Sequence, residues 1–501
     1  MMKDISSSVM SPSWMKHVQI AIICSIALGI IMCAGYKASQ ASMTHDESST
    51  YLNLIEGSTL NLWSCHRNPV CWTTANNHLL NTLLMRWSVR IIGPMEFALR
   101  LPNLLMLVVY LLSMILFLKD TVRTSAEAVF GVTLLTCNPF VLDFFALARG
   151  YGMGLGLMTL SIYAMWRYIR QGRGGFCVLA FAAATASVFA NLTYIAYVVA
   201  LTCTVFLLIV LPMIRRPRKQ IAGVVPLSMA CCLILLFAYF YRPILILIGL
   251  GEFEYGAPSL WESWKGFTRD SLYGVMWIGE RTFDVVSIGS TLILGLCVIT
   301  AWTPSLHEDK KTETEFGRFL SVLFLALIAF FVFSHVFTGA SYPTGRKTII
   351  LYSPAALLVY AVMRRGIPIA RIWVQMIMAA LGILLVVHFV RTYNCHSYRE
   401  WWYDASTKEM IHYVATKSSP GDTISLGVEW IFHPSTGFYV QTLHLPVALA
   451  PYSKEISKDS PVEYYYAHPD QAKSLEPDFT LEKNFEGRLL MKRVGAVSGE
   501  R

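Results

Sequence analysis

Long apolar runs separated by short polar connections occupy the chain up to about residue 390. About 20 apolar residues are needed for a helix to cross the roughly 30 Å hydrocarbon core of a bilayer. By that measure the pattern predicts about eleven membrane-spanning helices, of which the third and the fifth are short. They lie near residues 18–37, 97–118, 125–142, 150–168, 175–190, 193–213, 221–248, 283–302, 319–338, 347–363 and 369–390.

The basic residues in the connections indicate how these helices are oriented. Short loops that face the cytoplasm are enriched in Lys and Arg. In this chain the basic residues occupy every second connection. We therefore expect the N-terminus, residues 1–17, in the cytoplasm and the C-terminus outside. The basic positions are Lys119 and Arg123; Arg167, Arg170 and Arg173; Arg215, Arg216, Arg218 and Lys219; Lys310, Lys311 and Arg318; and Arg364, Arg365 and Arg371.

The composition agrees with a membrane protein. Hydrophobic residues make up 55% of the 501 residues, charged residues make up 15%, and the mean hydropathy is +0.49. Soluble chains carry about a quarter charged residues. The net charge of +9 is spread over the loops rather than gathered on a soluble face, so it does not indicate a nucleic-acid partner.

The first apolar run has a second interpretation. Lys16 and His17 precede it and residues 38–41 follow it, a pattern that a cleaved signal peptide can also show. The run is about nineteen residues long, enough to span a bilayer. We therefore expect an uncleaved anchor, and residues 18–392 form the predicted transmembrane domain.

The outer loops are unusually long. The first covers about residues 38–96 and contains apolar residues at helical spacing from Leu79 to Ile91, which predicts an amphipathic helix on the membrane surface or on the bundle. Another, about residues 249–281, is rich in Trp and Tyr, which favour the headgroup level. Cys65 and Cys71 lie in the first loop and could form a disulfide if that loop faces an oxidising compartment.

After about residue 393 the composition becomes that of a water-exposed domain. Residues 403–417 have a helical pattern, and strands are predicted at 423–428, 437–440 and 489–491. The fold class expected is therefore an α-helical polytopic membrane protein with a small extracytoplasmic α/β domain at residues 393–501.

Polar residues that can carry chemistry occur in five places on the predicted outer side. A carboxylate inside or beside a membrane is costly unless it is paired, which makes it a candidate functional residue. The five places are His45, Asp46 and Glu47 followed by Tyr51; Asn76, Asn77 and His78; residues 138–151, with Asp143, Arg149 and Tyr151; residues 341–347, with Tyr342, Arg346 and Lys347; and residues 394–402, with Tyr398, Arg399, Glu400, Trp401 and Trp402.

Each place also has a structural interpretation. Arg149 could pair with Asp143 at a helix end, His78 could simply begin a helix, and Arg346 could anchor an interface. His45, Asp46 and Glu47 could bind a divalent ion, although no further ligand spacing supports this. Together, however, they describe an outward cavity with acids and arginines. A base that accepts the proton of a hydroxyl group, combined with arginine side chains that bind a phosphate, suits the transfer of a group from a phosphate-activated donor.

At these residues the sequence resembles the polytopic GT-C glycosyltransferases, particularly the bacterial branch related to protein O-mannosyltransferases and lipid A aminoarabinose transferases. The resemblance covers about residues 18–400. It rests on Asp46 and Glu47 in a long first outer loop, on Asn77 and His78 before a Leu-rich helix, on residues 97–103, on the turn 148–151, and on Tyr342, Pro343 and Arg346.

The resemblance implies a reaction and roles for these residues. A hexose or pentose would move from a polyprenyl-phosphate donor to an acceptor hydroxyl with inversion, on the periplasmic or exterior face of a bacterial inner membrane. Asp46 would be the general base, Glu47 would orient or assist, and Asp143 would be a second acidic position. Arg149, Arg346 and Lys347 would hold the phosphate. The other substrate-binding candidates are His45, Tyr51, Asn77, His78, Tyr151 and Tyr342.

Several features stay open. The acceptor could be a lipid, a glycan or a protein, and members of the family differ in whether they need a metal, so a divalent cation is not assigned. The main alternative is a transporter or flippase for a lipid-linked or anionic solute, which would place its polar residues near the bilayer midplane, often in paired repeats. A non-catalytic scaffold subunit is a third reading.

Overall fold

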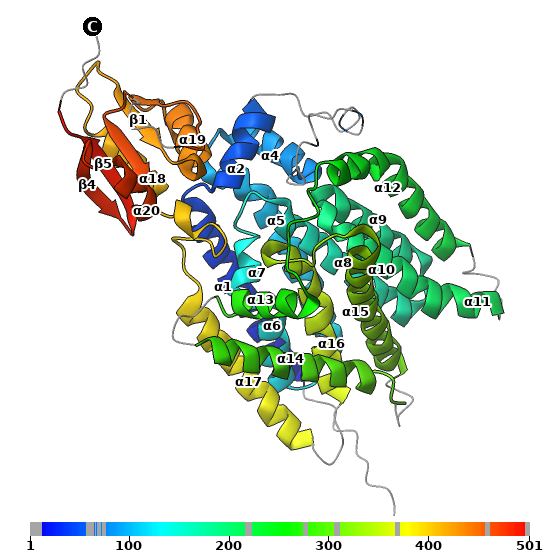
Figure 1. Cartoon of the computed structure of the whole chain (residues 1–501). Coiled ribbons are helices and arrows are strands. Elements are labelled where there is room, and N and C mark those ends of the chain that lie inside the picture. Colours follow the sequence, from blue (N-terminus) through cyan, green and yellow to red (C-terminus); the bar gives the residue numbers. More distant parts are fainter. Residues whose placement is uncertain are drawn as a thin grey trace, which may run out of the picture.

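The structure is a computed structural model that describes residues 13–56, 65, 67, 72, 77–215, 223–273, 279–304, 311–365, 371–455 and 461–495. The chain forms a helical bundle with a small mixed domain attached to one end, as the red and orange elements of Figure 1 show. We call that end of the bundle the domain end. Residues 1–12 of the expected N-terminal tail, and Cys71, lie outside the described residues.

Eight segments among the described residues are long and apolar enough to cross a membrane. The chain is thus a multi-pass membrane protein. The spans comprise α1 (Ser13–Gln40), α5 (Glu96–Thr121), the run η3 (Leu192–Tyr194), α10 (Ile195–Val205), η4 (Phe206–Val210) and α11 (Leu211–Arg215), then α12 (Val224–Gly249), α14 (Glu280–Thr300), α15 (Lys311–Thr338), η6 (Gly345–Leu351) with α16 (Tyr352–Arg365), and α17 (Arg371–Thr392).

The other three predicted runs also lie on helices. They are α6 (Ser125–Thr136), α8 (Gly150–Gln171) and α9 (Gly174–Ala190), of which α6 and α9 are short. The predicted run 125–142 is interrupted because Asn138 caps a separate short helix, α7 (Pro139–Asp143), and proline suits a first helical turn but not a helix interior. The number of eleven crossings therefore stays a prediction.

The N-terminal end of α8 packs very closely against its neighbours. A Cβ atom on Gly150 would lie 1.8 Å from the carbonyl oxygen of Ala190 at the end of α9. One on Gly154 would lie 2.1 Å from the ring of Tyr194. Glycine at these positions lets the start of α8, and Arg149 just before it, approach the end of α9.

Short helices cover the domain end of the bundle. They are α2 (His45–Thr50), η1 (Tyr51–Glu56), α4 (Leu79–Ile92) and α13 (Leu260–Ser271). Helix α4 is the predicted amphipathic helix, and its inward side carries Asn81 and Thr82, which are buried. Trp87 and Ile91 are 59% and 83% exposed, so its apolar side faces outward, as expected for a helix that contacts lipid.

The C-terminal domain is built around a five-stranded mixed sheet of order β2-β1-β3-β5-β4. Strand β1 pairs in parallel with β2 and β3, and β5 pairs antiparallel with β3 and β4. The elements are η8 (Trp402–Asp404), α18 (Thr407–Ala415), β1 (Ile424–Val428), η9 (Trp430–Phe432), α19 (His433–Leu443), β2 (Val447–Leu449), β3 (Tyr464–Ala467), α20 (Pro469–Ala472), η10 (Lys473–Leu475), β4 (Phe479–Phe485) and β5 (Arg488–Arg493).

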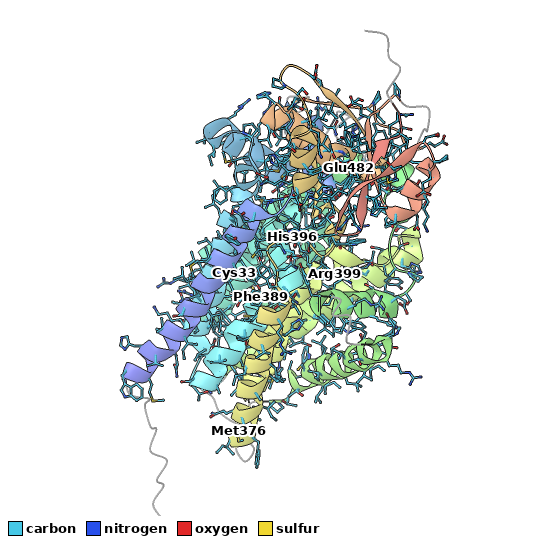
Figure 2. All side chains as sticks on the ribbon, turned by 90° about the vertical axis from the view of Figure 1, so that its left-hand side faces the viewer. Cys33, Met376, Phe389, His396, Arg399 and Glu482 are labelled. Carbon is cyan, nitrogen blue, oxygen red and sulfur yellow. The ribbon has the colours of Figure 1, made fainter. Side chains whose placement is uncertain are left out.

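The sheet confirms the predicted α/β domain and two of its three predicted strands. The strand expected at 437–440 is wrong, because these residues lie inside α19. A short apolar run does not distinguish strand from helix by periodicity, and Pro434 in the first turn favours a helix start. Figure 2 shows Met376 and Phe389 along α17, then His396 and Arg399 where the chain passes toward this domain.

Candidate active site

A short capped helix presents the two adjacent acids of the first loop. Thr44 begins α2 with a capping box: its hydroxyl accepts from the Glu47 backbone N–H at 3.4 Å, and the Glu47 carboxylate accepts from the Thr44 N–H at 3.0 Å. Asp46 therefore occupies a fixed position in the first turn. The local sequence folds in this way because Thr and Glu stand at the spacing that a capping box requires.

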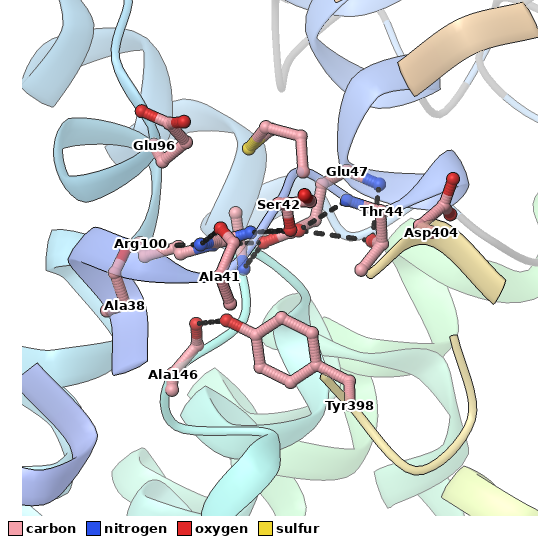
Figure 3. A network of polar contacts seen from close by, with 12 residues as sticks. Ala38, Ala41, Ser42, Thr44, Glu47, Glu96, Arg100, Ala146, Tyr398 and Asp404 are labelled. Atoms are coloured by element: carbon pink, nitrogen blue, oxygen red, sulfur yellow. Dashed lines mark hydrogen bonds and ion pairs between the residues drawn. The ribbon is translucent and has the colours of Figure 1, made fainter. Parts of the chain in front are cut away.

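The carboxylate of Glu47 is fully engaged with protein donors (Figure 3). Arg100 on α5 binds it with two arms, Nε to Oε1 at 2.9 Å and Nη2 to Oε2 at 2.8 Å. The backbone N–H of Ala148 also donates to Oε1. The side chains of Glu47 and Arg100 are completely buried. Glu47 thus ties the loop to α5, and both of its carboxylate oxygens are occupied by protein donors.

Arg100 also holds the backbone that leads into α2. Its guanidinium donates to the carbonyl oxygens of Ala38, Ala41 and Ser42 at 2.7–3.1 Å. The C-terminal domain contacts the same segment, since the Met43 N–H donates to the Tyr439 hydroxyl at 2.8 Å. The segment before Asp46 is consequently fixed both by the transmembrane bundle and by the C-terminal domain.

Asp46 has a different environment from Glu47. Its Oδ2 atom lies 3.2 Å from Nη1 of Arg346 and 3.6 Å from Nη2 of Arg149, and its side chain is 16% exposed. Burial alone would raise the pKa of Asp46, but the two guanidinium groups outweigh it and hold this pKa below its ordinary value. Asp46 is thus an ionised carboxylate between two cations that come from distant parts of the chain.

The two arginines are held by further contacts. Arg149 is buried and donates from Nη1 to the Thr50 hydroxyl at 3.0 Å. The guanidinium carbon of Arg346 lies 5.8 Å from the ring centre of Tyr151 and 5.1 Å from that of Trp401. Planar guanidinium groups of this kind can bind two oxygens of a phosphate.

His78 completes one side of this cluster. It is buried, and its ring meets the ring of Tyr151 edge-on at a centroid distance of 5.1 Å. Burial, followed by the charges of Arg149 and Arg346, lowers the pKa of His78 well below its ordinary value, so the imidazole is neutral. Among the described residues neither ring nitrogen has a hydrogen-bond partner, which leaves both able to bind a polar ligand. Asn77, its neighbour, is buried as well.

Five of the predicted site residues have hydrogen bonds, ion pairs or ring contacts with groups other than the Asp46 carboxylate. His45 donates its backbone N–H to Asp404, Tyr51 bonds to Glu56, and Lys347 donates to the carbonyl oxygen of Tyr255. Tyr342 stacks on His335. Asp143 forms a buried ion pair with Lys37 at 2.6 Å and accepts from the hydroxyl of Tyr273.

The alternative pairing of Asp143 with Arg149 is therefore wrong, because Lys37 on α1 takes that carboxylate and Asp46 takes Arg149. The sequence assigned no role to Glu400 or to Asp404. Glu400 lies in a segment that the sequence did flag. Asp404 gave no signal, since it is a single acid in a segment with a helical pattern and its partners Ser435 and His45 are distant in sequence.

Among the described residues no three His, Cys, Asp or Glu side chains are grouped so that they could hold a metal ion. Within the triplet considered for that role, Glu47 is saturated by Arg100, and Asp46 lies between two guanidinium groups that repel a cation. The Nδ1 atom of His45 lies 2.7 Å from the Ile431 carbonyl.

One of the two first-loop cysteines that could form a disulfide lies among the described residues. Cys65 is buried and disulfide-bonded, and the nine other cysteines among the described residues are free. A disulfide in this loop fits an oxidising compartment. The nine free cysteines include those inside the apolar spans, where thiols pack as small hydrophobic groups.

Comparison with known proteins identifies the fold. No family model and no curated protein matches the chain. Among solved structures it is similar to that of ArnT from Cupriavidus metallidurans bound to undecaprenyl phosphate, with a TM-score of 0.56 and 12% sequence identity over 96% of this chain and 99% of that chain. The oligosaccharyltransferase of Archaeoglobus fulgidus in complex with Zn and sulfate matches at 0.44 and 13%, over 90% and 68%.

The first of these likenesses covers nearly the whole of both chains. The chain is a polytopic membrane protein that shares the fold of ArnT, which confirms the predicted fold class. The structural likeness to ArnT includes the C-terminal domain, since 96% of this chain takes part in it.

Proposed function

We propose that the protein is a membrane glycosyltransferase that moves a sugar from a polyprenyl-phosphate donor to an acceptor hydroxyl. The observation that carries the proposal is the position of Asp46, an ionised acid 3.2 and 3.6 Å from two guanidinium groups. An acid alone could serve many reactions. An acid beside two phosphate-binding groups, at the domain end of a GT-C bundle, supports transfer from a lipid phosphate.

The proposed reaction is a direct displacement. Asp46 accepts the proton of the acceptor hydroxyl, and the resulting oxygen attacks the anomeric carbon of the donor sugar. The bond from that carbon to the phosphate oxygen breaks, and polyprenyl phosphate leaves with the electron pair. Attack opposite the leaving group inverts the anomeric configuration. Arg149 and Arg346 stabilise the charge that develops on the phosphate.

The paired arrangement also gives the donor a role in activating the base. In the free protein the guanidinium groups lower the pKa of Asp46 and so weaken it as a base. A donor phosphate that binds both arginines takes over part of their charge. The carboxylate then becomes more basic at the moment when the acceptor must be deprotonated.

A lipid-facing groove beside the site suits the tail of such a donor. It has a volume of about 670 Å³ and lies between α4, α9 and α12. Its wall on α9 reaches Phe189, next to Ala190, and the carbonyl of Ala190 touches the start of α8. The lining residues are Leu80, Val178, Phe181, Ala182, Thr185, Ala186, Phe189, Val224, Leu227, Ser228, Cys231, Cys232 and Leu235.

The groove thus begins at Leu80, two residues after His78 and in the first turn of α4. Its lining is almost wholly apolar. An isoprenoid chain in it would place the phosphate of the donor near Arg149. We propose that the domain end faces the periplasm of a bacterial inner membrane, which agrees with the basic loops at the other end. The acceptor would approach from the same side.

The test is to supply purified protein with polyprenyl-phosphate sugars and to measure free polyprenyl phosphate together with the glycosylated product. A transferase releases polyprenyl phosphate in proportion to product. A flippase or transporter in vesicles would move the donor intact and release none. Absence of release with every donor and acceptor offered, from protein that is folded, would contradict the proposal.

A further inference from the structure

Glu400 touches Arg346 at two places. It lies in the segment between α17 and α18, where the chain leaves the last membrane helix for the C-terminal domain. Its Oε1 accepts the backbone N–H of Arg346, and its Oε2 lies 3.5 Å from Nη1 of the same residue. One carboxylate therefore holds both the backbone and the guanidinium of Arg346.

The backbone at Gly345 is shaped to receive this carboxylate. Gly345 has φ +50°, and a Cβ atom added there would lie 2.1 Å from Oε1 of Glu400. Any side chain at position 345 would thus displace the acid, and the left-handed backbone would strain it as well. The carboxylate of Glu400 therefore fills the space beside the first turn of η6 that a side chain at position 345 would occupy.

The guanidinium atom that Glu400 approaches is the one that pairs with Asp46. Nη1 of Arg346 lies 3.5 Å from Glu400 and 3.2 Å from Asp46, so the two acids hold it from two sides. We propose that Glu400 is a positioning residue of the donor site, which fixes the guanidinium of Arg346 beside Asp46 so that it can receive the donor phosphate. This inference rests on the proposed function.

Ionisation of Glu400 falls in the neutral range. Burial raises the pKa of Glu400 to about 7, Arg346 opposes that rise, and the carboxylates of Asp270 and Asp46 add to it. The other charged or titratable groups that face it are Lys347 and Tyr403. As the pH falls through about 7, Glu400 takes up a proton and its attraction for the guanidinium weakens.

The decisive variant is Glu400→Gln, because the amide oxygen can still accept the Arg346 N–H while the charge is removed. In the wild-type protein kcat/KM for a polyprenyl-phosphate sugar should rise from about pH 6 to about pH 8 as Glu400 ionises. In the variant that rise should be absent, and the donor KM should stay roughly three- to tenfold higher, the range for one lost polar contact. A larger effect on KM than on kcat identifies positioning rather than proton transfer.

Glu409→Gln is the matched control. Glu409 is an exposed acid on α18, and it pairs with Lys483 on the surface of the C-terminal domain. The control should keep the wild-type pH profile and donor KM. If Glu400→Gln also follows the wild-type profile, the inference is overturned.

Gly345→Ala is a second variant that should remove the contact between Glu400 and Arg346. It keeps the charge of Glu400 but leaves no room for the carboxylate, so the donor KM should rise as in Glu400→Gln. An unchanged donor KM in folded Gly345→Ala protein would also overturn the inference. Melting temperatures of both variants verify that they are folded.

One readout does not depend on transfer. Because the folded-state pKa of Glu400 is raised above that of the unfolded chain, its contribution to stability is lost as pH rises from about 4 through about 7. Glu400→Gln lacks this loss and should gain melting temperature relative to wild type over that window. If the difference in melting temperature between Glu400→Gln and wild type does not vary with pH, the inference about Glu400 is overturned and the proposed function is not. If the wild-type protein transfers no sugar, the proposed function is overturned, and the donor role of Glu400 with it.

Discussion

The carboxylate of Glu47 receives two arms of the Arg100 guanidinium, at 2.9 and 2.8 Å, whereas its neighbour Asp46 lies 3.2 and 3.6 Å from two other arginines. Adjacent acids in the sequence therefore have separate tasks. Glu47 ties the loop to α5, and Asp46 is left beside two arginines that a donor can engage.

Loss of the Arg100 guanidinium should destabilise the fold. Arg100→Ala leaves the buried carboxylate of Glu47 without its counter-charge and frees three carbonyl oxygens. Breaking a buried pair from one side costs about 3–5 kcal/mol. The melting temperature and the yield of folded protein should fall, whereas Asp46→Asn should leave both near wild type. A stable Arg100→Ala protein would contradict the structural role of the pair.

Removing Arg346 should weaken donor binding. Arg346→Ala deletes one of the two cations beside Asp46, and a charge-assisted contact contributes about 1.5–3 kcal/mol. The donor KM should therefore rise roughly ten- to 150-fold. Lys347→Ala is the matched control, because Lys347 bonds to the Tyr255 carbonyl instead of facing Asp46. A donor KM unaffected by Arg346→Ala, or raised equally by both changes, would remove Arg346 from the site.

A bulky residue in the groove should discriminate between donors by tail length. Ala182→Trp fills part of the wall on α9, so the KM for a long-chain polyprenyl-phosphate sugar should rise while that for a short-chain analogue changes little. Leu179→Trp serves as the control, since Leu179 lies on the same helix, is 40% exposed and does not line the groove. Equal effects of the two variants on both donors would show that the tail binds elsewhere.

Asp404 should make stability depend on pH. It is buried, accepts the Ser435 hydroxyl at 2.7 Å and the His45 N–H at 2.7 Å, and burial raises its pKa to about 8. A carboxyl group with a raised folded-state pKa contributes stability that is present at about pH 4 and is lost as the pH rises through about 8. Asp404→Asn should flatten the decline in melting temperature over that interval. An unchanged decline would show that Asp404 does not titrate there.

The sequence was sufficient to bring the central residues together. The order of apolar runs and the positions of basic loops predict Asp46, His78, Arg149 and Arg346 on one side of the membrane, and in the structure Asp46 lies within 3.6 Å of both Arg149 and Arg346. That succeeded because a membrane fixes sidedness: a residue between two spans has only two possible locations.

The sequence did not predict which side chains on that side of the membrane pair with one another. Asp143 was considered with Arg149, but its partner Lys37 lies at the end of an apolar run and reaches it because α1 packs beside α6, the helix that precedes α7. Glu400 and Asp404 act through contacts with residues 54 and 359 positions away. Which long-range partners meet depends on how helices pack, and periodicity does not specify packing.

The most direct test of the account compares wild type with Asp46→Asn in the release of free polyprenyl phosphate from a polyprenyl-phosphate sugar. The asparagine keeps the shape of the side chain but cannot accept the proton, so kcat should fall by about two to four orders of magnitude. Melting temperature and donor binding should be retained. Release by Asp46→Asn near the wild-type rate would contradict the assignment of Asp46 as the base.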